Sequence, residues 1–412
     1  MKSVCDPNAC FACSACENIC PKQCIVRHQR DDSSWFMEID ESKCINCKLC
    51  EQVCPNVSGF ISHSASEAYA AWSSDSVIHK TAASGGIASE IYRYAAEKGW
   101  FFCGVGLDSA GNASFSITKD VADIEKFRNS KYTFSSMNGI YQKIAEQLKN
   151  EQTVVFVGLP CQVAALKNYV VKNRCEKNLI SVDLVCHGTP SPEYLKQHLR
   201  YVSNEAEKEV SECYFRDSSF GTNSYAFTAY TKQEQKPFYV KYVDQDDNYQ
   251  IGYHKAIIYR ECCYRCKFAQ NSRCGDITLG DYHGLGQESR YEHEKNEVSV
   301  VLINTEVGRT LINEIRQQER IVAYARPIAE PLKHERQLNG PSVAPPERES
   351  FLKYFKDEKN FDRAANLSFE NIKKKNKFRR MFPIHKVKQF LIKMIPRGLK
   401  EFLKELKRKF SK

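Results

Sequence analysis

Apolar residues in the middle of the chain recur at the spacings of alternating strands and helices. Runs of strand length cover residues 68–72, 100–105, 153–157, 179–185 and 298–304. Apolar residues at helical spacing occur after Ile87 and along residues 140–148, 162–172, 191–210 and 306–318. The strand, helix and strand over residues 153–185 predict a unit with parallel pairing. The pattern therefore predicts a body of mixed α+β / α/β class.

Polar and proline-rich segments separate these elements. Residues 56–67 are polar and Ser-rich, which is typical of a linker. Residues 224–230 and 238–243 alternate apolar and polar positions and predict an antiparallel addition. Residues 327–347 contain five prolines, the first of them Pro327, and predict an irregular arm over the surface. We expect units over residues 1–60, 66–150, 151–350 and 351–412, the last of them a basic helical tail.

Two cysteine-rich runs precede the body. Residues 10–21 and 44–55 each have the pattern C-x2-C-x2-C-x3-C-P, in which three thiolates hold one [4Fe-4S] cluster and the fourth reaches the other cluster. The turn at each proline carries the fourth cysteine away from the first three. We assign one cluster to Cys10, Cys13, Cys16 and Cys54, and the other to Cys44, Cys47, Cys50 and Cys20.

Other interpretations of these cysteines fit less well. Zinc sites usually use separated C-x2-C pairs, whereas these cysteines occur as triplets. A disulfide framework needs export to an oxidising compartment, and the first residues form no apolar signal segment. Cys5 and Cys24 lie outside both motifs and are expected to be ordinary thiols near the clusters.

The amino-acid composition limits the number of domains and indicates the cellular compartment. With 412 residues, 42% of them hydrophobic, the chain can bury two or three domains beyond the cluster module. No apolar stretch reaches the roughly 20 residues that cross a bilayer, so we expect a cytoplasmic protein. Its 19 cysteines then indicate metal chemistry in a reducing compartment.

The net charge of +10 is concentrated in residues 371–412, where sixteen Lys or Arg face two Glu. A charge confined to a tail does not indicate nucleic-acid binding. Leu399, Phe402, Leu403, Leu406 and Phe410 share one helical face there, and the segment around Val387, Phe390, Leu391 and Met394 repeats the scheme. A basic amphipathic tail predicts peripheral contact with an anionic membrane, at its inner face. The alternatives are docking on an acidic partner or a merely solvated, frayed helix.

Two cysteines follow predicted parallel strands. Cys161 and Cys186 would emerge side by side at the edge where open α/β sheets bind ligands. Cys263 and Cys266 have the C-x2-C spacing that offers two thiolates to one metal centre. The alternative is that Cys161 and Cys186 are small buried apolar residues. The turn Ser84-Gly85-Gly86 before a helix suits a phosphate or simply caps that helix.

Seven motifs together resemble the family of the coenzyme F(420) hydrogenase/dehydrogenase beta subunit, over about residues 66–350. They are Thr81-Ala-Ala-Ser-Gly-Gly86, Ser130-Lys-Tyr132, Gly158-Leu-Pro-Cys-Gln162, Asp183-Leu-Val-Cys-His-Gly188, Phe215-Arg-Asp217, Cys263-Tyr-Arg-Cys-Lys-Phe268 and Gly275-Asp-Ile-Thr-Leu-Gly-Asp281. A two-cluster ferredoxin module is a familiar N-terminal attachment in that family. The resemblance implies a body that binds FAD beside an iron–sulfur centre.

Carried over by position, the resemblance assigns cofactor contacts. Ser84, Gly85 and Gly86 would hold the flavin phosphates, and Ser130, Lys131 and Tyr132 would contact the same cofactor. A third [4Fe-4S] cluster would be held by Cys161, Cys186, Cys263 and Cys266, with Cys262 or Cys274 as possible replacements for one of them. The sequence departs from the family at His283, where relatives usually have Trp. His283 either shapes a different substrate pocket, donates a proton near the flavin or is a packing residue, and the same alternatives apply to His187. No catalytic residue is assigned.

The predicted iron–sulfur clusters and the implied flavin together indicate an oxidoreductase. Our leading hypothesis is that reduced ferredoxin or a similar one-electron donor feeds the clusters, which pass electrons to FAD and then to a small organic substrate. Family members associated with cell-surface polysaccharide synthesis make substrate reduction realistic. The alternatives are that the chain is part of a coenzyme F(420) dehydrogenase, or that it is a non-catalytic electron-transfer component of a larger complex.

Overall fold

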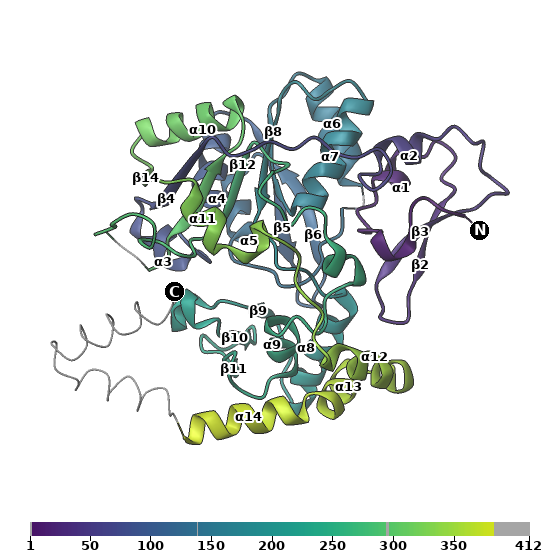
Figure 1. Cartoon of the computed structure of the whole chain (residues 1–412), viewed down its shortest axis with the longest axis vertical. Coiled ribbons are helices and arrows are strands. Elements are labelled where there is room, and N and C mark those ends of the chain that lie inside the picture. Colours follow the sequence, from purple (N-terminus) through teal and green to yellow (C-terminus); the bar gives the residue numbers. More distant parts are fainter. Residues whose placement is uncertain (1, 138, 294–295, 383–412) are drawn as a thin grey trace, which may run out of the picture.

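The computed structural model describes residues 2–137, 139–293 and 296–382 (Figure 1). A small N-terminal module lies beside a central sheet with helices on both faces. A third part, built from a small sheet and helices, lies below this sheet in the view of Figure 1. None of the helices within these ranges is long and apolar enough to cross a membrane.

The N-terminal module is built around a three-stranded antiparallel sheet. Its order is β1 (Lys2–Ser3), β3 (Trp35–Ile39) and β2 (Ile25–Gln29). Two five-residue helices, α1 (Ala15–Ile19) and α2 (Leu49–Val53), each begin inside one cysteine run. The module therefore consists of two similar cysteine loops held by one small sheet.

The central sheet has eight strands in the order β14-β4-β13-β12-β8-β7-β5-β6. The strands β12, β8, β7 and β5 form a parallel centre, and the pairs towards both edges are antiparallel. The predicted parallel unit over residues 153–185 is thus confirmed. The bounds are β4 (Glu67–Ser73), β5 (Phe101–Leu107), β6 (Ala113–Thr118), β7 (Val154–Gly158), β8 (Leu179–Leu184), β12 (Ile277–Asp281), β13 (Ser299–Ile303) and β14 (Ile321–Arg326).

Helices cover both faces of this sheet. The helices α4 (Ile87–Glu97) and α10 (Glu306–Gln317) pack with α5 (Ile124–Phe127) on one face. The helices α6 (Ile140–Lys149) and α7 (Pro160–Lys172) pack on the other face. Ile91 of α4 and Ile315 of α10 are fully buried, and each such side chain stabilises the fold by about 1.5–3 kcal/mol. The apolar stripes at helical spacing are thus the sheet-facing sides of the helices.

The third part has its own core. It contains α8 (Pro192–Ala206), α9 (Asn248–His254) and a sheet in the order β11 (Tyr239–Lys241), β10 (Phe227–Tyr230) and β9 (Glu212–Tyr214). The predicted antiparallel pair is present, but it forms this separate sheet. The reason is a second apolar cluster, built on Tyr194 and Phe227, that gives these strands a core away from the main sheet.

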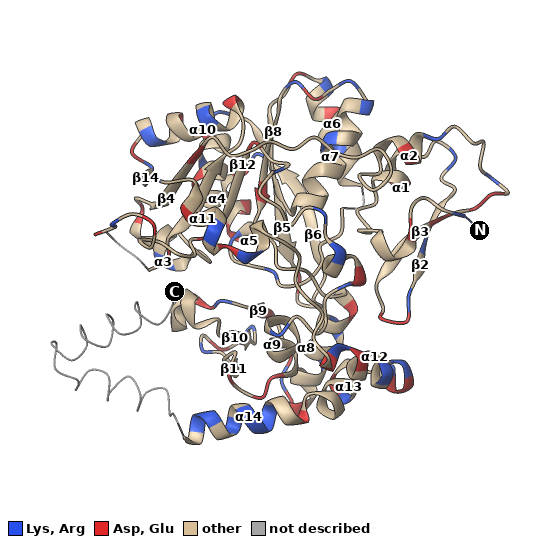
Figure 2. Ribbon diagram, viewed as in Figure 1, with Lys and Arg blue, Asp and Glu red and all other residues tan. Residues whose placement is uncertain are grey.

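The C-terminal helices belong to this third part. The helices α12 (Glu347–Glu358) and α13 (Phe361–Ser368) bury Phe351, Phe355 and Phe361 against α8 and α9. The structure therefore places residues 351–369 in the body rather than in a tail. The helix α14 (Glu370–Met381) is strongly basic (Figure 2). The amphipathic pattern predicted for residues 387–410 lies outside the described residues.

Shorter elements complete the chain. The arm over residues 327–347 contains the helix α11 (Ala329–His334) and a 3-10 turn, Arg336–Leu338. The helix α3 (Ser76–Thr81) follows β4. Further 3-10 turns are Pro7–Ala9, Val121–Asp123, Ser218–Phe220, Thr222–Ser224 and Glu261–Arg265.

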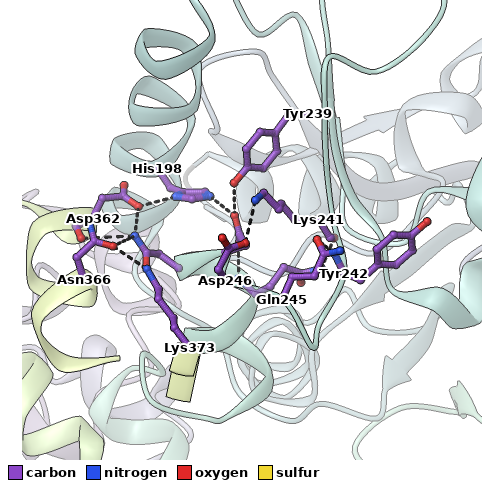
Figure 3. A network of polar contacts seen from close by, with 12 residues as sticks. His198, Tyr239, Lys241, Tyr242, Gln245, Asp246, Asp362, Asn366 and Lys373 are labelled. Atoms are coloured by element: carbon purple, nitrogen blue, oxygen red, sulfur yellow. Dashed lines mark hydrogen bonds and ion pairs between the residues drawn. The ribbon is translucent and has the colours of Figure 1, made fainter. Parts of the chain in front are cut away.

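A buried polar network ties α13 to the rest of the third part (Figure 3). His198 of α8 lies 2.8 Å from Asp362 through Nδ1 and 2.9 Å from Asp247 through Nε2. Asp247 also caps α9 and accepts a hydrogen bond from Tyr239 at 2.7 Å. Because α9 ends at His254, this network fixes the helix whose other end reaches the large cavity described below.

Candidate functional site: three cysteine cavities and a large pocket

The module contains two cysteine-lined cavities. The structure brings together each set of four cysteines that the spacing assigns to one cluster. The first cavity is lined by Cys10, Cys13, Cys16 and Cys54, and the second by Cys20, Cys44, Cys47 and Cys50. In both, the fourth thiol comes from the other run, as the crossed assignment requires.

Each cysteine loop wraps its cavity through left-handed backbone. Ala12 and Ser14 have φ of 53° and 64°, and Asn46 and Lys48, at the equivalent positions, have φ of 54° and 60°. Such conformations are unfavourable for non-glycine residues, at about 1–2 kcal/mol each. Their repetition at matching positions indicates that the loops are shaped for a ligand.

A fifth cysteine lines each of these cavities. Cys5 lies in the first cavity and Cys24 in the second. The Cys24 sulfur is 3.4 Å from the Cys20 sulfur. Both thiols therefore lie in the cavity walls beside the four predicted ligands.

The two cavities differ in exposure. The four cysteines of the first are at most 9% exposed, whereas Cys47 of the second is exposed and Cys44, Cys50 and Cys20 are half-buried. The first cavity faces the body, because Phe11 and Cys13 share an apolar core with α6 and α7. The second is thus the outer site and the first the inner site.

Direct contacts fix the module on the body. Tyr141 of α6 donates a hydrogen bond to the Cys13 carbonyl at 2.7 Å, and Arg260 donates one to the Phe11 carbonyl at 2.7 Å. The Phe11 ring lies 5.0 Å from the ring of Phe268, which follows Cys266 in the chain. The inner loop is therefore held against the cysteines of the body.

A third cysteine cavity lies in the body, beside Phe11. It is lined by the four predicted cysteines, Cys161, Cys186, Cys263 and Cys266, and also by Cys262. Cys274 is buried outside this lining, and its backbone N–H donates to Asp183 at 2.9 Å. Among the described residues, no three His, Cys, Asp or Glu side chains are grouped closely enough for a single metal ion. Four thiols spread around one cavity suit a larger inorganic cluster.

Arg260 supplies positive charge at this third cavity. Burial alone would lower its pKa, but the neighbouring thiols of Cys262 and Cys263 raise it overall. Its guanidinium lies 3.5 Å from the Phe134 ring centroid and donates to Thr189 at 3.2 Å. A buried cation fits a cavity whose thiols must be deprotonated to bind iron.

A buried ion pair positions the loop that carries Cys263 and Cys266. Arg273 donates to Asp183 of β8 at 2.8 Å and also to the Phe268 carbonyl at 3.1 Å. Both side chains are at most 1% exposed. Sequence reasoning did not single out this pair, although Asp183 stands in one of the quoted motifs.

A large cavity of about 420 Å³ adjoins the third cysteine cavity. It lies at the carboxyl ends of β7, β8 and β12, where an open α/β sheet binds ligands. Leu159 and residues 186–189 line both cavities. A group held by the cysteines would therefore be next to a ligand in the large cavity.

The glycine turn contributes one wall of the large cavity. Ser84 and Gly86 line it, and Gly86 has φ of +81° and precedes the first turn of α4. The N-terminus of α4 thus opens on the cavity, as a phosphate site requires. Gly85 is absent from the lining: its N–H donates to Ser299 at 2.9 Å, and a Cβ would meet the Ala71 carbonyl at 2.3 Å. Its role here is close backbone packing.

Ser130, Lys131 and Tyr132 all line the same cavity. The Lys131 ammonium donates to backbone carbonyls of its own loop, including that of Asn129 at 3.2 Å. Burial lowers the pKa of Lys131 to about 7. Tyr132 stacks on Tyr253 with ring centroids 4.2 Å apart. The segment thus offers the cavity a hydroxyl, a titratable amine and an aromatic face.

Unpartnered polar atoms show that this wall suits a polar ligand. Within the part of the chain that the structure describes, three buried atoms of the lining have no hydrogen-bond partner: Arg128 Nε, Asn129 Oδ1 and His254 Nε2. Leaving such atoms unpaired is costly, so a ligand that bonds to them is favoured. The helix N-terminus, Arg128 and Lys131 therefore fit a phosphate-bearing cofactor such as FAD.

The lining of the large cavity also contains charged groups that sequence reasoning did not assign. Arg216 donates to both carboxylate oxygens of Asp281, at 2.9 and 2.7 Å, and its guanidinium lies over the Tyr225 ring. His254 is kept neutral because burial lowers its pKa to about 4. Arg216 and Asp281 stand in quoted motifs, but their contact joins segments that only the fold brings together.

The two histidines next to sequence motifs also line the large cavity. His187 also lines the third cysteine cavity, and burial lowers its pKa. His283 follows β12, and its Nε2 lies 3.4 Å from Oε2 of Glu335. Neither lies in a purely apolar packing environment.

A two-cavity cysteine module joined to an α/β body with a ligand pocket defines an iron–sulfur protein of the oxidoreductase type. Comparison with known families agrees: residues 9–57 match the 4Fe-4S dicluster domain. Residues 68–141 and 151–327 match the N-terminal and C-terminal parts of the coenzyme F420 hydrogenase/dehydrogenase beta subunit. The chain belongs to this family, and the predicted resemblance is confirmed.

Individual relatives are more distant. The chain is 27% identical over 188 residues to a protein of Methanosarcina mazei that is a component of its F(420)H(2) dehydrogenase. The match covers 43% of the chain and spans about half (53%) of that relative. A solved structure of the F420-reducing [NiFe] hydrogenase complex from Methanosarcina barkeri contains a chain that is 18% identical, with a TM-score of 0.43. That match covers 78% of this chain and 94% of the other.

Proposed function

We propose that this chain is an iron–sulfur flavoprotein that passes electrons between a one-electron carrier, such as ferredoxin, and an organic substrate. It would hold two [4Fe-4S] clusters in the module, a third at Cys161, Cys186, Cys263 and Cys266, and FAD in the large cavity. The clusters would supply one-electron transfer, and FAD would supply exchange between single electrons and hydride.

The observation that supports this proposal is that neighbouring cavities share lining residues along a path from the module to the large cavity. The outer site is exposed at Cys47, and the inner site lies between it and the body. Phe11 lines both the inner site and the third cysteine cavity. Cys186 and its neighbours line both the third cavity and the large one. These contacts favour a single route from the surface to the pocket.

Different residues of the chain would bind the clusters and the flavin. Three sets of thiols would hold clusters, and Arg260 and Arg273 would keep the third set in place. The N-terminus of α4, with Ser84 and Gly86, would bind the flavin phosphates, and Arg128 and Lys131 would add charge-assisted hydrogen bonds. The aromatic faces around Tyr132 would exclude water from the ring system.

The deciding experiment is anaerobic purification of the full chain with iron, sulfide and FAD quantified per protein. About twelve irons and one FAD support the proposal, since each cubane contributes four irons. About eight irons would leave only the module clusters. Protein without FAD, even after incubation with FAD, would contradict a flavin site.

Two other functions make distinct predictions. The printed name of the relative from Methanosarcina mazei favours a second candidate, oxidation of reduced coenzyme F420. Anaerobic mixing with that coenzyme and a one-electron acceptor tests it, and an unchanged coenzyme spectrum rules it out. The third candidate is a non-catalytic component of a larger complex, and substrate turnover by the isolated chain would exclude it.

A role in cell-surface polysaccharide synthesis would appear as reduction of a nucleotide-sugar or lipid-linked sugar substrate.

We also propose a cytoplasmic location with contact at the inner membrane face through residues 371–412. Exposed Phe378 and Met381 on the basic helix α14 support this proposal. Each basic residue near an anionic lipid surface contributes roughly 1 kcal/mol of attraction. Deletion of residues 371–412, followed by sedimentation with anionic vesicles, tests this contact.

A further inference from the structure

Electrons that arrive through iron–sulfur clusters come without protons. A substrate reduced by two electrons usually also takes up two protons, so protons must reach the large cavity by another route. The question arises only if the proposed function is correct, and the inference below rests on it.

His283 and Glu335 are in contact at the wall of the large cavity and differ in their exposure to solvent. Both line the cavity, and His283 Nε2 lies 3.4 Å from Glu335 Oε2. The His283 side chain is 48% exposed, whereas the Glu335 side chain is 4% exposed. The pair therefore has one titratable group in water and a second one inside.

The Glu335 carboxylate is held in a fixed position. Its Oε1 accepts a hydrogen bond from the Gln337 backbone N–H at 3.0 Å, which leaves Oε2 for His283. His283 itself directly follows the strand end at Asp281 and the adjoining Tyr282. Both partners thus come from segments anchored by the sheet and by the arm over residues 327–347.

Apart from the exposed Arg336, the other charged groups around the pair are already engaged or kept neutral. Asp281 on β12 is bound by Arg216, and His334 on α11 lies 2.9 Å from Glu288. His187 and His254 face the same space, and burial lowers the pKa of both. Arg336 follows Glu335 in the chain. The contact between His283 and Glu335 therefore lies among groups whose charges are mostly paired or absent.

We propose that His283 and Glu335 form the path by which protons enter the large cavity. Protonated His283 gives its Nε2 proton to Glu335 Oε2, and the carboxyl group then releases that proton into the cavity. The neutral imidazole regains a proton from water. Two such cycles accompany each pair of electrons from the reduced one-electron carrier, so that the organic acceptor gains two electrons and two protons.

The test follows reduction of bound FAD in the anaerobic full chain after rapid mixing with reduced methyl viologen. In the wild type, the rate should fall as pH rises, because fewer protons enter the path, and should be lower in D2O. The variant His283→Gln should be about tenfold slower at pH 7, without that pH dependence, and imidazole buffer should restore its rate. The variant Glu335→Gln should be slow at all pH values and should not respond to imidazole.

His334→Gln is the matched control, because His334 is a neighbouring histidine paired with a different carboxylate. It should keep the wild-type rate and pH profile. A readout independent of turnover is the NMR signal of His283 Nε2 in protein with labelled histidine, which Glu335→Gln should shift because the 3.4 Å contact with Oε2 is lost. Iron and FAD contents per chain verify that each variant is loaded.

The outcomes separate this inference from the proposed function. A wild-type chain that binds neither FAD nor a third cluster overturns the proposed function, and the proton path with it. Loaded His283→Gln protein with the wild-type rate and pH profile overturns the proton path alone. Equal slowing by His334→Gln would also overturn it, because the effect would then not depend on contact with Glu335.

Discussion

Replacing His198 tests whether a buried charged network holds the C-terminal helices on the body. His198 is 1% exposed and lies between the carboxylates of Asp362 and Asp247 (Figure 3). Burial alone would lower its pKa, but these two carboxylates raise it from 6.5 to about 10. We predict that His198→Gln detaches α13 and loosens α9, because it leaves both carboxylates without a cation.

The size of the effect follows from the pKa. A rise of this size corresponds to about 5 kcal/mol, at about 1.4 kcal/mol per tenfold change in proton affinity. Breaking a buried ion pair by removing one partner costs a similar amount, about 3–5 kcal/mol. We therefore expect a loss of roughly 3–5 kcal/mol in local unfolding free energy at pH 7.

The pH dependence has a definite sign. The folded pKa of His198 is above its unfolded value, so its stabilisation is complete below about pH 6.5 and is lost as pH rises through about 10. The difference between wild type and His198→Gln should therefore shrink from pH 7 to pH 10.

Hydrogen exchange by mass spectrometry measures this region directly. Peptides from α9 and α13 should exchange faster in His198→Gln, whereas peptides from the central sheet should not change. His28→Gln is the control, because the His28 side chain is 52% exposed. Unchanged exchange in α13, or a difference that does not vary with pH, would refute the assignment of a buried imidazolium.

Four further predictions concern the site and the tail. Asp183→Asn should release the loop of the third cysteine cavity, because it removes the charge that binds Arg273. An iron assay should then find about eight irons per chain instead of about twelve, and the spectrum of the module clusters should be retained. An iron chelator should remove about four irons quickly and the rest slowly, since Cys47 is exposed and the inner thiols are buried; a single phase would contradict this order. Lys131→Met should weaken FAD binding about tenfold below pH 7 and little above pH 8 in titrations, because the Lys131 pKa is about 7; Lys126→Met, at an exposed neighbour, should have no effect. Deleting residues 371–412 should abolish salt-sensitive sedimentation with anionic vesicles, and unchanged sedimentation would exclude the membrane contact.

Much of the fold was predictable because burial imposes a period on the sequence. The run over residues 153–157 became β7, and the stripe over residues 306–318 became α10, since both patterns are set by one buried face. The small sheet with β10 and β11 was misplaced for a physical reason. Alternation reveals that a strand has one apolar face, but not which core that face joins.

The candidate sites were also predictable from the sequence only in part. The cysteine runs determined by themselves the two cluster loops and their crossed pairing, because that information lies in spacings of two and three residues. The third cysteine cavity, the contact of Arg216 with Asp281, and the pair of His283 with Glu335 join segments about 50 to more than 100 residues apart. Only the packing of the parallel strands brings such segments to one sheet edge. Local spacing thus determined the loops that suit iron, and sequence motifs indicated one wall of the large pocket, whereas tertiary structure decided which charged residues from distant segments complete that pocket.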